Sequence, residues 1–538
     1  MREESLFSNR LGQYYRVLTR RIDWLWIVIL LLFSVLLFTI NLGNLPLRDW
    51  DEGTVALVAR GIHRAPFTSW QWLYPLLEGN TYHNKPPLMH WLIALMYTWW
   101  GENEWTTRLP GAILTAVSVP LLYCIGREIF YQRMAAVYSA LVYLTMLPVV
   151  RHGRLAMLDG TSVCFFLLML LCALRSRRDL RYCLGVGIGL GLICLTKGIL
   201  GILLGAIAFG FLWWDTPRLL IHPYMGIAIV IGLIPVVGWH IAQYLHYGQQ
   251  FTQIGIVHQS LSRIWTAVEE NGQPIWYYGL ELLKYLWPWL IFLPTSIKNT
   301  WENRNLSWAK LALVWTIGYF LPISVMTTKL PWYLYPIYPA IALLLGAQLA
   351  QIQHTPLLSK YPRFWSISLG LLGAIAGIGS VYYSSVQPPQ TDVRLILLVV
   401  AGTMVLSGIL AKRGDQQFIQ VLLWGSYLSL FLLMKSNHWL WELNEHYPVK
   451  PVAQMLSTAT PNQAKIYTSF PFHRPSLNFY SDRTVIPLPP EEIPKYWQSQ
   501  PQGFFLLQEQ DLQSFKLHAV KRLANSTDWI LVTQDRKS

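Results

Sequence analysis

Residues 22–42 read IDWLWIVILLLFSVLLFTINL, an apolar run with a single carboxylate near its start. A helix needs about 20 consecutive apolar residues to cross a bilayer, so this run predicts a membrane span. Arg20 and Arg21 stand directly before it, and it lacks a small-residue cleavage site. Because basic flanks stay on the cytoplasmic side and the run does not have the form of a cleaved signal, we expect an uncleaved anchor that starts inside the cell.

The composition of the chain also indicates a membrane environment. Of 538 residues, 53% are hydrophobic and 13% are charged, with 26 Trp, and the mean hydropathy is +0.33. Soluble domains carry about 25% charged residues. The net charge of +14 does not indicate nucleic acid, because the basic residues fall mostly in short loops that orient helices. The five cysteines lie inside apolar runs and lack the paired spacing of a metal site or a disulfide framework.

Similar apolar runs recur along the chain and predict about thirteen membrane-spanning helices. Their approximate limits are 22–42, 106–126, 134–150, 155–174, 182–196, 199–214, 223–245, 276–297, 308–327, 332–350, 364–383, 393–411 and 417–434. The run at 87–100 is too short for a span, and we expect it to lie flat on the membrane. Every predicted cytoplasmic loop then contains Lys or Arg, whereas counting 87–100 as a span would move all of them outside.

The chain changes character after residue 434. Residues 435–538 gain Pro, Gln and Asp, and their apolar segments shorten to strand length. We expect a small soluble α/β or α+β domain on the outer side, with strands near 464–470, 484–488, 503–507 and 529–533 and helices near 452–457 and 491–498. The expected division is a transmembrane domain at 1–434, whose long first outer loop covers 43–105, and a soluble domain at 435–538.

Ionisable residues gather at the predicted outer ends of the helices, where charge is costly enough to make each one a functional candidate. The first outer loop contains three neighbouring carboxylates, Asp49, Asp51 and Glu52. Further candidates on the same side are Arg60, Lys85, Asp159, Lys197, Arg263 and Lys329. A carboxylate near several cations suits the transfer of a sugar from a lipid phosphate, which needs a base for the acceptor hydroxyl and positive groups for the departing phosphate.

Simpler roles are open for some of these residues. Asp51 or Glu52 could cap a helix that begins near Thr54, and Arg60 could reach from the membrane interface to lipid headgroups. Lys197 lies between two long apolar runs without an acidic neighbour in sequence, as does Lys329, so these two lysines are better functional candidates.

Several motifs occur in an order that is specific as a set. The strongest are Asp51-Glu52, residues 82–92 (YHNKPPLMHWL), residues 104–110 (EWTTRLP) and Gly126-Arg127, and the weaker ones are residues 154–159 (RLAMLD), 195–198 (LTKG) and 329–339 (KLPWYLYPIYP). This set resembles the polyprenyl-phosphate-sugar glycosyltransferases of the GT-C class (families 39 and 83). The similarity is greatest to the branch of the lipid A aminoarabinose transferase and to the related protein O-mannosyltransferases.

The resemblance implies a polytopic helical fold with a soluble outer domain, and a first outer loop that carries the catalytic base, Asp51. It implies Asp159 as a second acidic position, and Glu52 is a further acidic candidate beside the base. It also implies that Lys85 contacts the carrier phosphate. The same analogy extends phosphate or carrier contacts to Arg60, Lys197, Lys329 and Tyr333, and Arg263 joins them as a cation of a long outer loop.

Asn84 departs from the branch that acts on lipid A, which often has Glu before the Lys-Pro-Pro sequence. The motif therefore does not predict a metal site through this position, and His83 and His258 are the candidate ligands of a divalent metal. The preferred hypothesis is a metal-independent, inverting transfer in the inner (plasma) membrane. Its donor is a polyprenyl-phosphate-linked sugar and its acceptor is a lipid, a glycan or a protein.

Two other functions compete with this hypothesis. A transporter or lipid flippase also needs charge in the membrane, but it predicts internal repeats with broken helices and sites near the midplane, whereas these charges gather at one face. An oligosaccharide ligase would differ by using a sugar chain as its donor.

Overall fold

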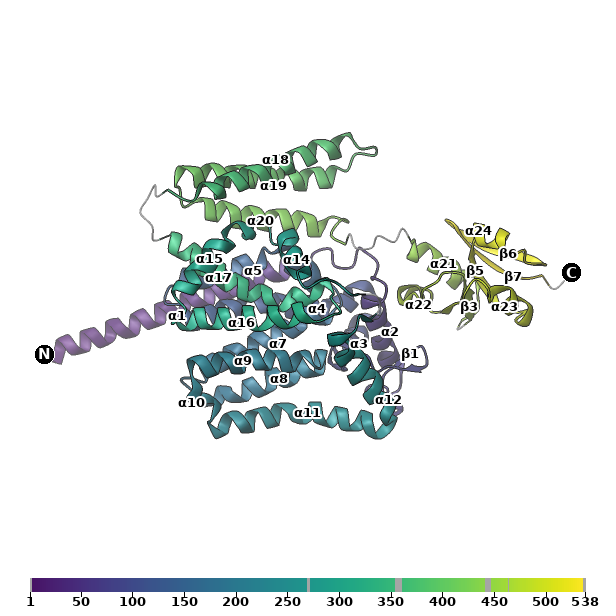
Figure 1. The fold of residues 1–538 in the computed structure, drawn as a ribbon, viewed down its shortest axis with the longest axis horizontal. Coiled ribbons are helices and arrows are strands. Elements are labelled where there is room, and N and C mark those ends of the chain that lie inside the picture. Colours follow the sequence, from purple (N-terminus) through teal and green to yellow (C-terminus); the bar gives the residue numbers. More distant parts are fainter. Residues whose placement is uncertain (1, 269–270, 354–359, 441–446, 463, 536–538) are drawn as a thin grey trace. The chain divides into compact units, whose positions relative to one another are not determined.

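The structure is a computed structural model that describes residues 2–268, 271–353, 360–440, 447–462 and 464–535, and it is mainly helical (Figure 1). The chain forms two compact units. Unit 1 contains Met1–Leu42, His83–Met89 and Leu109–Trp439, and unit 2 contains Gly43–Tyr82, His90–Arg108 and Leu440–Ser538. Most of the first outer loop therefore folds with the C-terminal residues.

The helices of unit 1 follow the expected spans. They are α1 (Arg2–Thr39), α4 (Glu104–Ile129, which begins in unit 2), α5 (Arg133–Leu144), α6 (Leu147–Gly153), α7 (Leu158–Arg175), α8 (Cys183–Lys197), α9 (Leu200–Asp215), α10 (Pro217–Leu220), α11 (Pro223–Tyr247), α12 (Gln249–Phe251), α13 (Ser262–Trp265), α14 (Tyr277–Tyr285), α15 (Leu293–Glu302), α16 (Ser307–Val325), α17 (Tyr338–Ile352), α18 (Arg363–Ser385), α19 (Thr391–Arg413) and α20 (Phe418–Lys435). A π-helix, η3 (Thr252–Leu261), precedes α13, and two 3₁₀ segments, η5 (Trp289–Phe292) and η6 (Pro331–Ile337), precede α15 and α17.

Ten helices among the described residues are long and apolar enough to cross a membrane. The pair α5 and α6, bent by 61°, makes an eleventh if it is one span. The other two expected spans look different: α9 has 16 residues, fewer than the ~20 that a bilayer needs, and the span near 276–297 is divided into α14, η5 and α15. The chain is thus a multi-pass membrane protein in which thirteen spans are reached only by counting a short and a broken one.

Glycines let α8 and α11 approach each other closely. A β-carbon at Gly187 would lie 1.7 Å from the carbonyl oxygen of Ala228, and one at Gly191 would lie 2.1 Å from that of Gly232. Lipid tails are as apolar as the side chains, so helix association in a bilayer depends on such close packing by small residues. Gly187 and Gly191 of the glycine repeat therefore build this helix pair.

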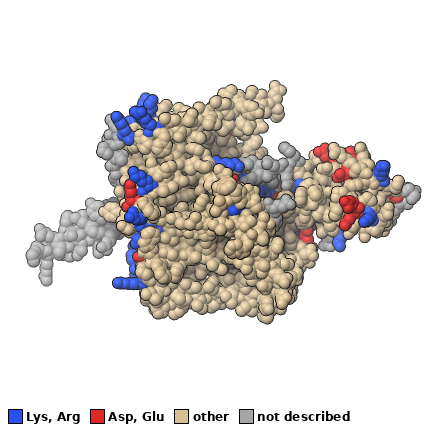
Figure 2. Space-filling model, viewed as in Figure 1, with Lys and Arg blue, Asp and Glu red and all other residues tan. Residues whose placement is uncertain are grey.

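Charges gather at one end of the helical bundle of unit 1, and Figure 2 shows Lys and Arg along this end, the left side of the view. Ion pairs join the helix ends that border the predicted cytoplasmic loops. They are Arg127–Asp23 and Arg133–Asp23 (both 2.9 Å), Arg175–Glu128 (3.2 Å) and Arg177–Asp215 (2.6 Å). These are the basic loops that the sequence assigns to the cytoplasm.

The C-terminal part of unit 2 contains a five-stranded mixed sheet in the order β4-β3-β5-β7-β6. The strands are β3 (Lys465–Thr468), β4 (Thr484–Pro487), β5 (Phe504–Gln508), β6 (Val520–Ser526) and β7 (Trp529–Gln534). The helices are α21 (Val449–Ala459), α22 (Pro475–Ser481), α23 (Ile493–Ser499) and α24 (Glu509–Ser514). All four predicted strands are confirmed, while the edge strand β6 was missed because its side chains are largely polar and none of them is buried.

The first outer loop contributes five short elements to unit 2. They are α2 (Asp51–Arg64), η1 (Phe67–Ser69), the hairpin strands β1 (Leu76–Leu77) and β2 (Asn80–Thr81), and α3 (Leu88–Trp100), whose first two residues belong to unit 1. The 13 residues of α3 form the short helix that the sequence predicts. Its position flat on the membrane remains a prediction.

Candidate active site

The three carboxylates of the first outer loop have different surroundings in unit 2. Glu52 is fully buried, and Arg108 donates to its two oxygens from Nε at 2.8 Å and Nη2 at 2.7 Å. The Asp49 side chain is 9% exposed and accepts a hydrogen bond from Arg474 Nη1 at 2.6 Å. The Asp51 side chain is 29% exposed. Asp51 is therefore the most accessible of the three carboxylates for a substrate.

The start of α2 bears on the capping role considered for the two acidic residues. The helix begins at Asp51, its N-cap residue is Trp50, and no side chain caps it. Glu52 Oε2 accepts a hydrogen bond from the backbone N–H of Arg48 at 3.0 Å, and Arg48 Nη2 lies 3.4 Å from Asp51 Oδ2. Asp51 thus lies in the first helical turn, where its charge suits the helix dipole, and the helix starts earlier than the expected position near Thr54.

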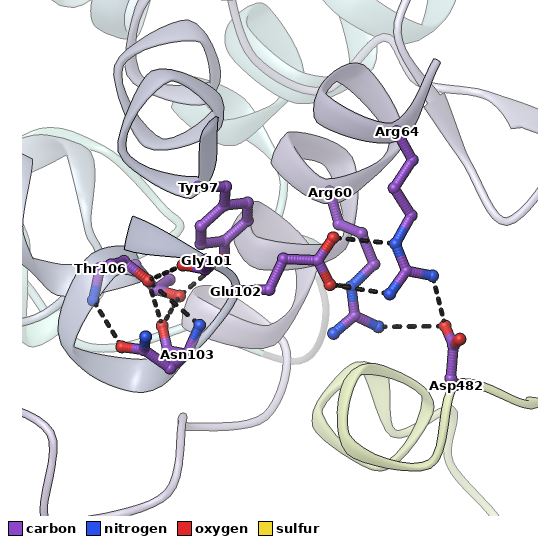
Figure 3. A network of polar contacts seen from close by, with 9 residues as sticks. Arg60, Arg64, Tyr97, Gly101, Glu102, Asn103, Thr106 and Asp482 are labelled. Atoms are coloured by element: carbon purple, nitrogen blue, oxygen red, sulfur yellow. Dashed lines mark hydrogen bonds and ion pairs between the residues drawn. The ribbon is translucent and has the colours of Figure 1, made fainter. Parts of the chain in front are cut away.

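Arg60, on α2, lies in a network of charged side chains (Figure 3). Its Nε is 2.9 Å from Glu102 Oε2 and its Nη1 is 3.5 Å from Asp482 Oδ1. Arg64 binds the same two carboxylates, with Nη2 2.8 Å from Glu102 and Nη1 2.7 Å from Asp482. The Arg60 guanidinium also lies 3.8 Å from the ring centroid of Phe479. In unit 2 this arginine holds α2 to the loop after α3 and to α22, and its contact with a carrier remains a prediction.

Asp159 and Lys197 meet in unit 1. Asp159 lies in the first turn of α7 and Lys197 is the last residue of α8. The Lys197 Nζ donates to Asp159 Oδ1 at 2.5 Å, and the two side chains are 13% and 5% exposed respectively. The same Nζ lies 5.3 Å from the ring centroid of Tyr333. The acidic partner that the sequence around Lys197 lacks is therefore supplied by the neighbouring helix.

Arg263 and Tyr333 extend this cluster. Arg263 Nη1 donates to the Tyr333 hydroxyl at 3.3 Å, and its Nη2 donates to Gln259 Oε1 at 3.2 Å. The Tyr319 hydroxyl donates to the backbone carbonyl of Tyr333 at 2.9 Å. Gln259 lies in the π-helix η3, a rare form that often occurs at functional sites. Four predicted site residues, Asp159, Lys197, Arg263 and Tyr333, are thus linked in one chain of contacts.

Lys329 has a different environment. Its Nζ donates to the carbonyl of Gln273 at 3.0 Å and to that of Met326, and its backbone N–H donates to Asn271 at 2.9 Å. Desolvation by burial lowers the pKa of the Lys329 ammonium. This lysine therefore ties the segment before α14 to the segment before η6, and its contact with a phosphate remains a prediction.

Lys85 lies in the His83–Met89 segment of unit 1, before α3. The neighbouring His83 ring packs against Tyr247 and Phe251, with centroids 4.6 Å and 5.9 Å away, and burial lowers the pKa of His83. His258 is exposed on η3. No group of three or more His, Cys, Asp or Glu in the described part of the chain could hold a metal ion.

Comparisons with known proteins agree with the motifs. The model of the dolichyl-phosphate-mannose-protein mannosyltransferase family matches residues 84–241. An undecaprenyl phosphate-alpha-4-amino-4-deoxy-L-arabinose arabinosyl transferase of Pseudomonas fluorescens is 27% identical over 377 residues, which cover 68% of this chain and 67% of the relative. The corresponding transferase of Pseudomonas aeruginosa is 25% identical over 429 residues, 77% of this chain and 76% of the relative.

Solved structures show a shared fold. ArnT from Cupriavidus metallidurans, crystallised with undecaprenyl phosphate, superposes with a TM-score of 0.76 at 18% identity, covering 95% of this chain and 98% of that one. The protein is a membrane glycosyltransferase, and it has the GT-C fold. The two Pseudomonas relatives are transferases, so the comparisons favour a glycosyltransferase over the transporter or flippase alternative.

Some residues that contact the candidate site residues of this glycosyltransferase were not singled out from its sequence. Arg108 lies in the quoted motif of residues 104–110, but its pairing with Glu52 could not be inferred from spacing. Gln259 and Tyr319 carried no sequence signal. Arg474 had none either, because its partner Asp49 is 425 positions away in sequence.

Proposed function

We propose that this glycosyltransferase moves a single sugar from a polyprenyl phosphate, of the undecaprenyl type that the matched transferases use, to a lipid, glycan or protein acceptor. The observation that carries this proposal is the exposure of Asp51 beside two carboxylates that are buried in ion pairs. A general base must reach the proton it removes, and Asp51 is the member of the three that meets this requirement best.

The proposed reaction is a single displacement with inversion. The acceptor hydroxyl attacks the anomeric carbon of the sugar, Asp51 takes the hydroxyl proton, and the bond from that carbon to the phosphate oxygen breaks. The electron pair of that bond leaves with the carrier phosphate, whose negative charge rises as the bond breaks. Cations that are already in place stabilise such a charge at little reorganisation cost.

The cations proposed for this role are Lys85 and the cluster of unit 1. The Lys197 ammonium lies near the ring of Tyr333, and Arg263 donates a hydrogen bond to the Tyr333 hydroxyl. Asp159 holds the Lys197 ammonium at 2.5 Å, which supports a positioning role for this carboxylate. A guanidinium, an ammonium and a hydroxyl together provide donors of the kind that bind phosphate oxygens.

We also propose that transfer occurs at the outer face of the inner membrane, with the N-terminus in the cytoplasm and the C-terminal residues outside. The ion-paired arginines at the ends of α4, α5 and α7 support this orientation, because basic loops remain cytoplasmic.

The test uses the purified enzyme in lipid nanodiscs with undecaprenyl-phosphate-linked sugars, together with mass spectrometry of envelope lipids, glycans and proteins from cells with and without the chain. Asp51→Asn keeps the size of the side chain but cannot accept the proton, so kcat should fall by about 10²–10⁴-fold while donor binding persists. Asp528→Asn, at an exposed turn before β7, is the control and should keep normal turnover. Near-normal turnover of Asp51→Asn together with loss in Asp159→Asn would move the base to Asp159, and transfer of a sugar chain would favour an oligosaccharide ligase.

A further inference from the structure

A short segment of the soluble C-terminal part, residues 470–476, contacts the loop that carries Asp51. Asp49 Oδ2 accepts a hydrogen bond from Arg474 Nη1 at 2.6 Å, and Asp49 Oδ1 accepts from the backbone N–H of Ser476 at 3.1 Å and from its hydroxyl. The Arg474 guanidinium is itself fixed between two rings, 4.0 Å from the centroid of Tyr447 and 3.8 Å from that of Phe470. Arg474 and Ser476 thus donate to the Asp49 carboxylate, and two aromatic rings hold the first of them.

The residue between Asp49 and Asp51 is in an unfavourable backbone conformation. Trp50 has φ 59° and ψ −60°, a region that costs a non-glycine residue about 1–3 kcal/mol and persists only when the surroundings enforce it. Its ring packs edge-on against Phe472, with centroids 6.1 Å apart. The soluble domain therefore contacts Asp49 and Trp50, the two residues directly before Asp51.

The residues after Asp51 meet the same segment. A β-carbon at Gly53 would lie 2.7 Å from the backbone nitrogen of Ser476, so the first turn of α2 approaches the start of α22 as closely as only glycine permits. Upstream, the backbone N–H of Leu47 donates to the Tyr480 hydroxyl at 2.8 Å. Contacts from residues between Arg474 and Tyr480 thus lie on both sides of Asp51 in the sequence.

We propose that Arg474 and Ser476 are positioning residues of the transferase, which act through Asp49 to hold the backbone of Asp51 in its working geometry. This inference rests on the proposed role of Asp51 as the base. It gives the soluble domain a part in the chemistry, because a base displaced by about 1 Å can lose about 10²-fold in rate. Asp49 itself touches neither substrate in this proposal.

A double-mutant cycle in nanodiscs tests the pairing. Arg474→Gln and Asp49→Asn should each lower kcat by about 10- to 100-fold with little change in KM for the lipid-linked donor. The double variant should be no slower than the worse single one, because the two changes break the same contact. Arg474→Lys, which keeps the charge, should retain more turnover than Arg474→Gln. The matched control is Arg522→Gln, which breaks the exposed Arg522–Glu509 pair of the same domain and should leave kcat unchanged.

Hydrogen exchange provides a readout that does not depend on the role of Asp51. Amides of residues 45–64 should exchange faster in Arg474→Gln and in Asp49→Asn, while the amides of β5 and β7 stay protected and show that the domain is folded. Normal kcat in both single variants, losses that multiply in the double variant, or unchanged exchange of residues 45–64 would each overturn the proposal. If Asp51→Asn turns over normally, the assigned base is wrong, and the exchange result alone then decides whether the segment holds the loop.

Discussion

Neighbouring residues of one kind can differ completely in their surroundings. Asp49, Asp51 and Glu52 are similar acids within four positions, yet two of them are buried in arginine pairs while the third is 29% exposed. Removing one partner of a buried ion pair leaves an uncompensated charge and destabilises the fold. Buried carboxylates that are paired in this way therefore contribute to stability. Asp51 is the most exposed of the three, and it is the carboxylate that we propose as the base.

The Glu52 pair predicts a stability effect at this scale. Arg108 donates to both Glu52 oxygens and also to the carbonyls of Leu45 and Pro46. Glu52→Gln leaves the buried guanidinium without its counter-charge, and such losses cost about 3–5 kcal/mol. We expect a clear drop in the melting temperature of the purified enzyme. Glu509→Gln, in an exposed ion pair with Arg522, should change it little, and equal melting of the two variants would contradict the prediction.

Lys85 predicts an effect on donor use. Loss of one charge-assisted contact to a phosphate is worth about 1.5–3 kcal/mol, or roughly 10- to 100-fold in rate. Lys85→Ala should therefore lower kcat/KM for the lipid-linked sugar by that factor without a change in melting temperature. Lys298→Ala, which removes a side chain that is 78% exposed, is the comparison. Unchanged kcat/KM in Lys85→Ala would remove this lysine from the donor site.

At the scale of elements, small contacts decide which helices and loops can pack. The pair α8 and α11 meets through glycine backbones, and the hairpin of β1 and β2 carries Glu78 at its turn, with φ 54°. Glu78 Oε2 is 2.8 Å from His473 Nε2, and the Asn478 amide donates to its other oxygen. Van der Waals packing thus holds α8 against α11, and polar contacts hold the hairpin. The helix pair should respond to a larger side chain, and the hairpin to a change of pH.

Gly187→Val tests the helix packing. The added side chain would meet the carbonyl of Ala228, and overpacking of this kind typically costs about 1–3 kcal/mol. We expect reduced yield and a lower melting temperature in detergent. Gly226→Val on α11 is a matched control, because a β-carbon there has no heavy atom within 4 Å, and it should behave as the unmodified enzyme. Equal stability of both variants would show that close packing of α8 on α11 is dispensable.

The Glu78–His473 contact predicts a pH dependence. The hydrogen bond to Glu78 raises the pKa of His473 above its ordinary 6.5, with Asp49 adding to the effect and burial opposing it. A raised pKa means that the pair stabilises the fold fully below about pH 6.5 and that this contribution disappears as the pH rises through the raised value. Exchange of the hairpin amides, corrected for intrinsic rates, should show less protection at about pH 8 than at about pH 6. In His473→Gln the difference should vanish, and its persistence would assign the pH dependence to another group.

At the scale of the whole molecule, the orientation of the chain decides on which side the chemistry occurs. We expect an odd number of spans, which would place the two termini on opposite faces, and the basic loops predict which face is cytoplasmic. The compact unit that joins most of the first outer loop to the C-terminal residues requires both to lie on the same side of the membrane.

Cysteine labelling tests this orientation. A cysteine at Ser499, which is exposed at the end of α23, should react with an impermeant maleimide on intact spheroplasts. A cysteine at Tyr131, fully exposed between α4 and α5, should react only after lysis. The five native cysteines lie in membrane helices, so the parent protein gives the background. The reverse labelling pattern would overturn the topology and the outer-face site with it.

The sequence by itself determined the membrane fold, most of the spans and four strands of the soluble domain, and it indicated candidate site residues. These features leave local traces, because a span must be apolar along its length and a strand alternates with a period of two. Only the tertiary structure decided that Asp49 pairs with Arg474 and Glu52 with Arg108, and that Lys197 meets Asp159. Partners far apart in the chain leave no pattern at any spacing, since their contact depends on how the elements between them pack.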